Sequence, residues 1–373
     1  MRTSTVQLGE ICDFTYGDAL KEETRRPGKV PVFGSNGIVG RHDKALTNGA
    51  TIIIGRKGSI GEINWSDGPC YPIDTTYFVE TTKQPCDLKW LYYALLQLDL
   101  TRLNKSAAVP GLNRDDAYEQ HVVFPPLPEQ RRITEQLEQA DRLRRTRRYA
   151  LELSDTFLPA AFLQLFGANG DKFPPSTVEE LAADKPHAIR TGPFGSQLLH
   201  SEFTDSGIAV LGIDNAVNNR FAWDQRRFIT PEKYGQLMRY TVFPGDVLIT
   251  IMGTCARCAI VPDDIPTAIN TKHLCCITLD QKRCLPIYLH GAFLHHPFVR
   301  HQLNVATKGA IMEGLNMEII KELRIPVPPP ALQGNFAGLV AHHEHLRAVQ
   351  RESLRQADHL FQSLLHQAFN RES

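Results

Sequence analysis

Apolar residues along this chain follow two kinds of spacing. Short runs rich in β-branched residues, such as 51–54 and 246–251, are bounded by glycine or proline and predict buried strands. The stretches 87–100 and 285–303 carry apolar residues three and four positions apart, which predicts a helix after each set of strands. Each half of the chain is therefore expected to form an α+β globule.

Two further stretches predict long amphipathic helices. Ile133 and Leu137 begin the apolar stripe of the first helix, and Phe336 and Val340 begin that of the second. The first helix is expected to reach about residue 166, with Pro159 kinking or restarting it. A long isolated helix is seldom stable in water unless its apolar stripe is buried, so we expect the two helices to form an antiparallel pair.

The chain also contains an internal repeat. Gly111-Leu112-Asn113 recurs as Gly314-Leu315-Asn316, and the proline-rich stretch ending at Gln130 recurs before Gln333, both 203 positions further on. Upstream, segments 48–54 and 73–76 resemble 244–250 and 269–272 at an offset of 196. These matches predict two tandem copies of one unit, and each copy consists of a globular module followed by a long helix.

The repeat and the helical spacing predict four regions. A first globular domain is expected at 1–127, a central helix at 128–167, a second globular domain at 168–327 and a C-terminal helix at 328–373. A chain of 373 residues is long enough for two such cores.

Composition restricts the function classes without choosing one. Apolar residues make up 42% and charged residues 22% of the chain, as in globular proteins. Lys and Arg number 41 and so do Asp and Glu, so any phosphate-binding face must be local. No apolar run is long enough to span a bilayer, and eight scattered cysteines without an export signal favour reduced thiols. We expect no membrane association and a cytoplasmic location.

The proline-rich motifs carry a family resemblance. Pro125-Pro126-Leu127-Pro128-Glu129-Gln130, followed by Ile133, resembles the opening of the spacer helices in specificity subunits of type I restriction–modification systems. The second copy, 328–333, keeps the prolines and Gln333, but Leu332 and Phe336 replace the glutamate and the isoleucine. The resemblance covers essentially the whole chain.

This resemblance implies a fold and a function. It implies an α+β protein with two target-recognition domains separated by a pair of long antiparallel helices, related by a pseudo-twofold repeat. Each domain would read one half of an asymmetric, bipartite site in double-stranded DNA, because the spacing of half-sites mirrors protein geometry. The chain itself would be non-catalytic and carry no cofactor. It would direct DNA methyltransferase subunits that bind S-adenosylmethionine, and a motor-nuclease restriction subunit is a further partner.

Two sets of residues are candidates for these contacts. The DNA-facing set rests on charge and on turn placement, and comprises Lys21, Arg25, Arg26, Arg56, Lys57, Lys105, Arg190, Arg226, Arg227 and Lys308. The set expected at the spacer helices and their partner comprises Pro125, Pro126, Pro128, Glu129, Gln130, Ile133, Leu137, Gln333, Phe336 and Val340.

Several motifs have more than one interpretation. The glycine-rich segment 55–61 lacks the Gly-Lys-Ser/Thr ending of a P-loop, so it predicts a tight turn from which Arg56 and Lys57 could contact DNA. The basic run 142–148 fits a solvated helix face as well as a contact to phosphate or to an acidic partner. The aromatic and basic segment 221–227 fits either a nucleic-acid surface or a partly exposed strand and turn.

The cysteines and histidines favour structural roles. Cys255, Cys258, Cys275 and Cys276 supply four thiols for zinc, but adjacent residues of a strand point to opposite faces, which favours buried apolar cysteines. His295, His296, His342, His343 and His345 are expected on helix surfaces. Asn270 stands where a metal nuclease would need a carboxylate, so nuclease chemistry is disfavoured.

A protein-interaction scaffold with two polypeptide-binding globules is the alternative function. DNA binding through phosphates would weaken steeply with salt, whereas such a scaffold would show little response to DNA.

Overall fold

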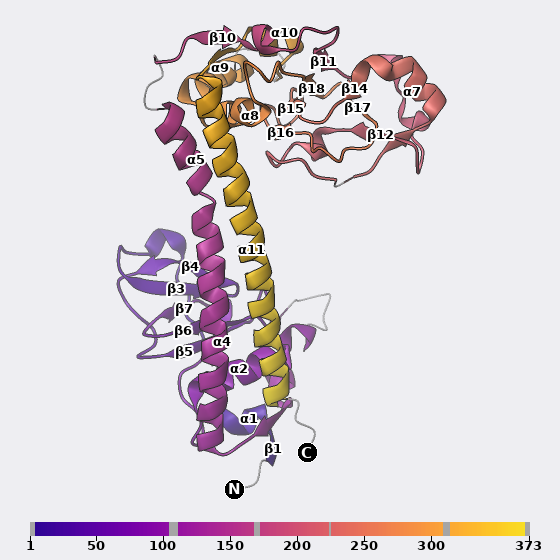
Figure 1. Ribbon diagram of the computed structural model, residues 1–373. Helices are drawn as coiled ribbons and strands as arrows, with labels where there is room; N and C mark the ends of the chain where they lie inside the picture. The colour runs from indigo at the N-terminus through magenta and orange to yellow at the C-terminus, as the bar shows by residue number, and fades with distance from the viewer. Residues whose placement is uncertain (1–3, 104–110, 168–171, 224, 309–313, 370–373) are drawn as a thin grey trace. The chain divides into compact units, whose positions relative to one another are not determined.

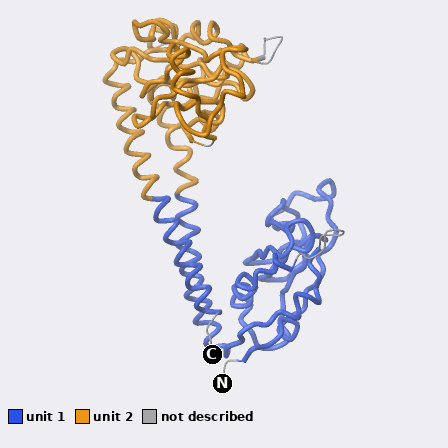
Figure 2. The backbone as a smooth tube through the Cα atoms, turned by 90° about the vertical axis from the view of Figure 1, so that its right-hand side faces the viewer, with its two compact units in different colours: residues 1–150, 350–373 blue, residues 151–349 orange. Residues whose placement is uncertain are grey.

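The computed structural model describes residues 4–103, 111–167, 172–223, 225–308 and 314–369. It divides into two compact units, which Figure 2 colours separately. Unit 1 comprises residues 1–150 and 350–373, and unit 2 comprises residues 151–349. Each unit thus contains one globular module and one portion of the long helices.

The module of unit 1 mixes short strands and helices (Figure 1). Its elements are β1 (Ser4–Gln7), α1 (Leu8–Ile11), β2 (Thr15–Tyr16), β3 (Val30–Gly34), β4 (Gly37–His42), β5 (Thr51–Gly55), β6 (Ile63–Ser66), β7 (Tyr71–Pro72), β8 (Thr76–Val79), α2 (Leu88–Leu98), α3 (Arg114–Tyr118) and β9 (His121–Phe124). The chain then enters α4 (Leu127–Ser154).

Unit 2 repeats this order with additions. Its elements are α5 (Phe157–Phe162), β10 (Pro175–Thr177), α6 (Val178–Leu181), β11 (Ile189–Thr191), β12 (Ile208–Leu211), β13 (Phe228–Ile229), α7 (Pro231–Leu237), β14 (Thr241–Val242), β15 (Val247–Thr250), β16 (Cys258–Ile260), β17 (Ala268–Asn270), β18 (Leu274–Ile277), α8 (Pro286–His295), α9 (Pro297–Lys308), α10 (Met317–Glu322) and β19 (Arg324–Pro326). The last helix is α11 (Pro330–Phe369).

The sheets show that the two modules share one topology. Unit 1 contains the sheet β2-β8-β5-β6, the sheet β4-β3-β7 and the pair β1-β9. Unit 2 contains β11-β18-β15-β16, then β13-β12-β17-β14, and the pair β10-β19. The sheets β4-β3-β7 and β13-β12-β17-β14 each contain one parallel pair of strands, β3 with β7 in the first and β12 with β17 in the second. The expected α+β class and the internal repeat are confirmed.

The pairing register corrects the predicted alignment of the strands. Ile52 and Ile54 face the main core of unit 1, as Val247 and Ile249 face that of unit 2, whereas Leu248 lies in a different cluster. Ile52 therefore corresponds to Val247 and not to Leu248. The offset of 196 was wrong by one residue here, because a one-residue shift in a strand turns every side chain to the other face.

The alignment of the segment after β7 needs a larger correction. Thr76 donates its backbone N–H to the carbonyl of Ile73, and Leu274 donates in the same way to Thr271. Ile73 therefore corresponds to Thr271, two positions beyond the residue predicted. The apparent match of Ile73 with Ile269 was wrong.

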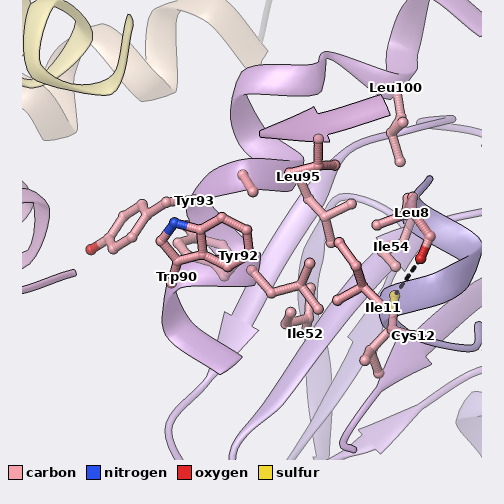
Figure 3. Close-up of a cluster of buried hydrophobic side chains, with 14 of the residues drawn as sticks. Leu8, Ile11, Cys12, Ile52, Ile54, Trp90, Tyr92, Tyr93, Leu95 and Leu100 are labelled. Atoms are coloured by element: carbon pink, nitrogen blue, oxygen red, sulfur yellow. Dashed lines mark hydrogen bonds between the residues drawn. The ribbon is translucent and has the colours of Figure 1, made fainter. Parts of the chain in front are cut away.

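The core of unit 1 joins the first sheet to the helices (Figure 3). Ile52 and Ile54 of β5 pack with Trp90, Tyr93 and Leu95 of α2, and all five are fully or almost fully buried. The same cluster takes in side chains from both long helices, namely Ile133, Leu137 and Ala140 of α4 and Phe361, Leu365 and Phe369 of α11. The apolar stripe predicted for the first long helix is therefore buried within unit 1.

The two long helices run antiparallel in each unit. In unit 1, Arg148 of α4 lies 3.4 Å from Asp358 of α11, and the Arg144 guanidinium lies 3.8 Å from the centre of the Phe361 ring. In unit 2, Phe157 stacks on His343, and Phe162 packs against Phe336 with ring centres 5.3 Å apart. The pairing expected from the amphipathic pattern is confirmed.

The first long helix stops earlier than expected. Alpha-helical structure ends at Ser154 and resumes at Phe157, with Pro159 in the first turn of α5, where a missing N–H costs little. The predicted restart near Pro159 is therefore confirmed, and the last residues before 168 form a π-helical turn at Leu163–Gly167.

Candidate nucleic-acid interface

The glycine-rich segment after β5 forms the predicted tight turn. Gly58 and Gly61 both have φ of +76°, a conformation that glycine adopts without strain. The Gly61 N–H donates to the Gly55 carbonyl at 2.8 Å, which closes the turn. The Leu112 N–H donates to the Arg56 carbonyl at 2.9 Å, so the Gly-Leu-Asn motif is bonded directly to this turn.

An aromatic and basic cluster forms beside this turn. Tyr16 at the end of β2 is 51% exposed, and the Arg56 guanidinium lies 5.2 Å from the centre of its ring. The Arg114 guanidinium lies 5.4 Å from the same ring. Arg114 occupies the first position of α3, whose N-terminus is capped by Asn113. We call Tyr16, Arg56 and Arg114 the Arg–Tyr–Arg cluster.

Arg56 is held in place by neutral groups. Its Nη2 and Nε donate to the Asp74 carbonyl at 2.6 and 3.2 Å. Its guanidinium also lies 5.9 Å from the Tyr77 ring, and burial raises the pKa of Tyr77 to about 12, so this phenol stays neutral. Within the described residues, no carboxylate forms an ion pair with Arg56 or Arg114. Lys57 is exposed beside them.

Other basic residues predicted to face DNA in unit 1 are partly engaged elsewhere. Arg25 donates to the Val39 carbonyl at 2.8 Å, and Arg26 pairs with Asp43 at 3.1 Å. Lys21 is exposed, next to a short 3-10 turn. Lys105 lies outside the described residues, as does the side chain of Lys308 at the end of α9.

Arg190 was wrongly predicted to face DNA. Its side chain is only 4% exposed and pairs with Asp246, which is fully buried. The Asp246 carboxylate also accepts hydrogen bonds from the Phe243 N–H at 2.8 Å and the Thr278 hydroxyl at 2.6 Å. The charge is therefore neutralised inside the module. Sequence reasoning missed this because Asp246 lies 56 positions further along the chain, just before β15.

Arg226 and Arg227 occupy a mixed aromatic and basic surface of unit 2. Arg226 is exposed and lies 5.8 Å from the Trp223 ring, which in turn packs edge-on against Phe221. Arg227 pairs with Asp214, and its side chain is 29% exposed. The segment thus combines features of both interpretations, with Arg226 available to a ligand and Arg227 held by the chain itself.

The two glutamines of the proline-rich motifs make equivalent contacts. Gln130 donates to the Pro125 carbonyl at 2.9 Å and accepts from the Asp87 N–H at 2.8 Å. Gln333 donates to the Pro328 carbonyl at 2.8 Å and accepts from the Leu285 N–H at 2.8 Å. Both side chains are fully buried. Each glutamine therefore ties the entry of a long helix to the start of a module helix.

The remaining motif residues lie around these glutamines. Pro128 and Glu129 belong to the first turn of α4, where Glu129 pairs with Arg132 at 2.6 Å. Pro125 is buried and Pro126 is half-buried just before α4. In unit 2, Phe336 replaces the isoleucine of the motif and fills an aromatic cluster with Phe162 and Phe166, while Val340 packs against the same core.

The basic run of α4 is largely paired within unit 1. Arg144 and Arg145 both contact Asp141 at 2.6 Å, and Arg148 lies near Asp358. Arg142 and Arg147 are exposed. The run is thus mainly a helix face with its own ion pairs, and two of its arginines remain at the surface.

The cysteines of unit 2 lie in the sheet. Cys275 and Cys276 of β18 belong to different core clusters, and Cys258 of β16 shares the cluster of Cys275. Burial raises the pKa of Cys275 to about 12 and raises that of Cys276 well above its usual value, so these thiols stay protonated. Among the described residues, no group of three or more His, Cys, Asp or Glu side chains could hold a metal ion.

Two histidines were wrongly predicted to lie on helix surfaces. His296 is 1% and His343 is 8% exposed. His343 donates from Nε2 to the Ser154 carbonyl at 3.1 Å and stacks on Phe157, so it packs where α4 ends. Helical spacing alone could not place these residues, because the partner of each is far away in sequence.

Taken together, the fold defines a class of tandem-duplicated α+β proteins with two modules and an antiparallel pair of long helices. Within the described part of the chain, no helix is long and apolar enough to cross a membrane.

The chain is similar to known proteins in sequence as well as in fold. Residues 3–153 match the model of the type I restriction modification DNA specificity domain. The specificity subunit of the type I restriction enzyme EcoBI from Escherichia coli is 22% identical over 407 residues, covering 98% of this chain and 85% of that protein. The resemblance indicated by the proline-rich motifs is confirmed.

Two solved structures share the whole fold. The S subunit of a type I restriction-modification system from M. genitalium has a TM-score of 0.64 at 17% identity, covering 100% of this chain and 97% of that one. A chain from a structure on complex assembly and conformational transition of the type I R-M system has a TM-score of 0.62 at 14% identity, covering 98% of this chain and 97% of that one.

Proposed function

We propose that this chain reads an asymmetric, two-part sequence in double-stranded DNA and directs methyltransferase subunits to it. The observation that carries the asymmetry is the difference between two equivalent surfaces. The positions of Tyr16, Arg56 and Arg114 in unit 1 are those of Thr191, Ile251 and Met317 in unit 2. Two modules with one fold and unlike surfaces suit two unlike half-sites, because groove-edge contacts specify sequence.

The catalytic roles in this proposal belong to partner subunits. A base inside a duplex must be flipped out before it can be methylated, so the methyltransferase subunit would bind S-adenosylmethionine and carry out the transfer. A motor-nuclease subunit would join the same assembly for restriction. The family match of residues 3–153 to a DNA specificity domain supports this division of labour.

Exposed apolar residues on the long helices support docking of a partner. Tyr149 of α4 is 61% exposed in unit 1, and Val349 of α11 is 52% exposed in unit 2. Large apolar side chains on otherwise polar helices are typical of protein interfaces. A Tyr149→Asp variant should therefore reduce co-purification of the methyltransferase subunit, and unchanged co-purification would argue against this docking face.

Methylome sequencing of the host, with and without this gene, tests the proposal directly. We expect one methylated motif to disappear with the gene, and that motif to consist of two unlike parts with a fixed gap. Selection of bound duplexes from a random pool, with and without the methyltransferase subunits, should return the same motif. No sequence preference in either condition would contradict the proposal and favour the polypeptide-binding scaffold.

The helices offer a second test. Inserting four residues, about one helical turn, between Glu135 and Leu143 should change the gap without changing either half-site. Exchanging the module before Pro125 should change only one half-site. An insertion variant that keeps the original gap would mean that α4 does not set the spacing.

A further inference from the structure

We propose that the Arg–Tyr–Arg cluster binds the phosphodiester backbone of the DNA at the first half-site. This inference rests on the proposed function and adds a specific site to it. The sequence alone did not predict a DNA contact for Tyr16 or Arg114. It predicted one for Arg56 only from its charge and its position in a turn.

The geometry presents two cations on one exposed aromatic ring. The guanidinium groups of Arg56 and Arg114 lie 5.2 and 5.4 Å from the centre of the Tyr16 ring. Both distances are within the range of attractive cation–π contacts, which preorganise a planar guanidinium. A planar guanidinium presents paired N–H donors that match two phosphate oxygens. The Tyr16 hydroxyl adds one more donor.

The charge balance favours an anionic ligand. Several arginines of this chain have a carboxylate partner, for example Arg26 with Asp43 and Arg227 with Asp214. In the described part of unit 1, neither cation of the cluster has one. Two like charges that share one ring repel each other, and a phosphate bridging them would relieve this repulsion. The exposed side chain of Lys57 extends the positive surface.

The backbone around Arg56 is fixed before any ligand binds. Its N–H donates to the Thr75 carbonyl at 2.9 Å, and its carbonyl accepts from Leu112. The side chain is also anchored on the Asp74 carbonyl. A preorganised arginine loses less conformational entropy on binding. At Gly58, a Cβ atom would meet no heavy atom within 4 Å, so the tip of the turn is not covered by neighbouring side chains.

Unit 2 lacks this chemistry at the corresponding place. Ile251 stands at the position of Arg56 and is only 4% exposed. Its carbonyl accepts from Leu315, as the Arg56 carbonyl accepts from Leu112. Met317 takes the place of Arg114 as the first residue of the capped helix. The cluster is therefore a property of unit 1 and not of the shared fold.

The test uses the full-length chain and a 40-base-pair duplex of random sequence as the probe. Arg56→Gln and Arg114→Gln should each weaken binding about 5- to 10-fold at about 0.1 M salt and reduce the log–log salt slope by about 0.9. Arg131→Gln is the matched control, because Arg131 is exposed on α4 in the same unit. It should change neither quantity.

Two further variants separate charge loss from misfolding. Arg114→Lys keeps the cation, so it should restore most of the salt slope that Arg114→Gln loses. Tyr16→Phe keeps the ring and should retain the slope, whereas Tyr16→Ala should weaken binding. Unchanged unfolding midpoints in urea would verify that each variant is folded.

The outcomes distinguish this inference from the proposed function. If the wild type enriches a motif from a random pool but both glutamine variants keep its affinity and slope, the cluster is not a phosphate site and the function stands. A variant that relaxes one base position with an unchanged slope would mean base reading instead, which also overturns the inference. A wild type that enriches no motif would overturn the proposed function itself.

Discussion

The two modules share one backbone plan but use it differently at the same turn. After β5, the turn carries Arg56 and Lys57 beside an exposed tyrosine, whereas after β15 the chain continues with buried Ile251. The turns are otherwise alike, since Gly58 and Gly253 both have positive φ, as do Gly61 and Ala256. Backbone geometry is therefore kept where the fold needs it, and the side chains that reach the surface are free to differ.

The interiors of the two modules also differ. Arg190 and Asp246 form a buried ion pair in unit 2, whereas the residues at the same register positions in unit 1 are the exposed Thr15 and the buried Thr51. The scaffold thus accepts either an ion pair or two hydroxyl side chains. A buried ion pair is costly to break from one side, because the remaining charge is left without a partner.

The largest expected effect comes from removing Asp246. Asp246→Ala should destabilise unit 2 by about 3–5 kcal/mol, because Arg190 would stay buried and unpaired. Trp223 is the one tryptophan outside unit 1, so its fluorescence during urea unfolding reports on unit 2. The double variant Arg190→Met, Asp246→Leu should recover most of the stability. A loss as large in the double variant as in the single one would contradict this account.

Replacing either buried glutamine, Gln130 or Gln333, should lower stability by less than removing Asp246, and by similar amounts in the two units. Gln130→Ala and Gln333→Ala each leave a partly buried backbone N–H and a buried proline carbonyl without a partner, at a cost of about 2–3 kcal/mol. Gln333→Ala also removes a partly buried hydrogen bond to the Arg283 carbonyl.

Gln139→Ala, an exposed change on α4, should fall within about 0.5 kcal/mol of wild type. Urea unfolding followed by the fluorescence of Trp65 and Trp90 in unit 1 and of Trp223 in unit 2 measures the loss of stability in each unit. Clearly unequal losses would show that the two helix entries are not equivalent.

Acid should weaken unit 2 through its buried histidines. Burial lowers the pKa of His290, and also that of His273, His295 and His296, below the ordinary value of 6.5. Below pH 6.5 the unfolded chain then binds protons that the folded chain does not, so stability falls as pH drops and is unaffected above that range. His290 contributes up to about 1.4 kcal/mol per pH unit. His273 and His295 contribute less, because solvent screens partly exposed groups.

Unfolding of unit 2 at pH 7.5 and pH 5.5, followed at Trp223, checks this expectation. His290 donates from Nε2 to the carbonyls of Asn219 and Cys258, and a His290→Gln variant keeps a donor without the titration. This variant should therefore show a smaller loss at pH 5.5 than wild type. An identical loss in both proteins would exclude His290 as a source of the acid sensitivity.

Removing a surface ion pair should have the smallest effect on stability, and this effect should be similar in the two units. Arg220 pairs with Glu344 at 2.7 Å in unit 2, and Arg148 lies 3.4 Å from Asp358 in unit 1, with all four side chains more than one-third exposed. Glu344→Gln and Asp358→Asn should each cost no more than about 0.5 kcal/mol, and less at high salt. A loss above about 1 kcal/mol in either variant would mean that the pair is coupled to the helix contacts around it.

Local signals in the sequence predicted much of the fold. The β-branched runs gave strands, the glycine-rich segment gave a turn, and the apolar stripe gave buried Ile133 and Leu137. Register was harder to predict. The match of Gly49 with Gly245 was locally convincing, but the faces of a strand are set by its pairing with distant residues. Only the pairing of Ile52 with Val79 and of Val247 with Ile277 showed that Ile52 corresponds to Val247.

The sequence by itself determined the duplication, because capping asparagines, helix-opening prolines and glycine turns act within a few residues of themselves. The sequence could not determine which arginines remain free to bind a ligand. Arg56 and Arg190 were both predicted to face DNA, yet Arg56 lies beside the exposed ring of Tyr16, whereas Arg190 pairs with the buried carboxylate of Asp246. That choice depends on partners brought together by long-range strand pairing. Only the tertiary structure decided which arginine can meet a ligand.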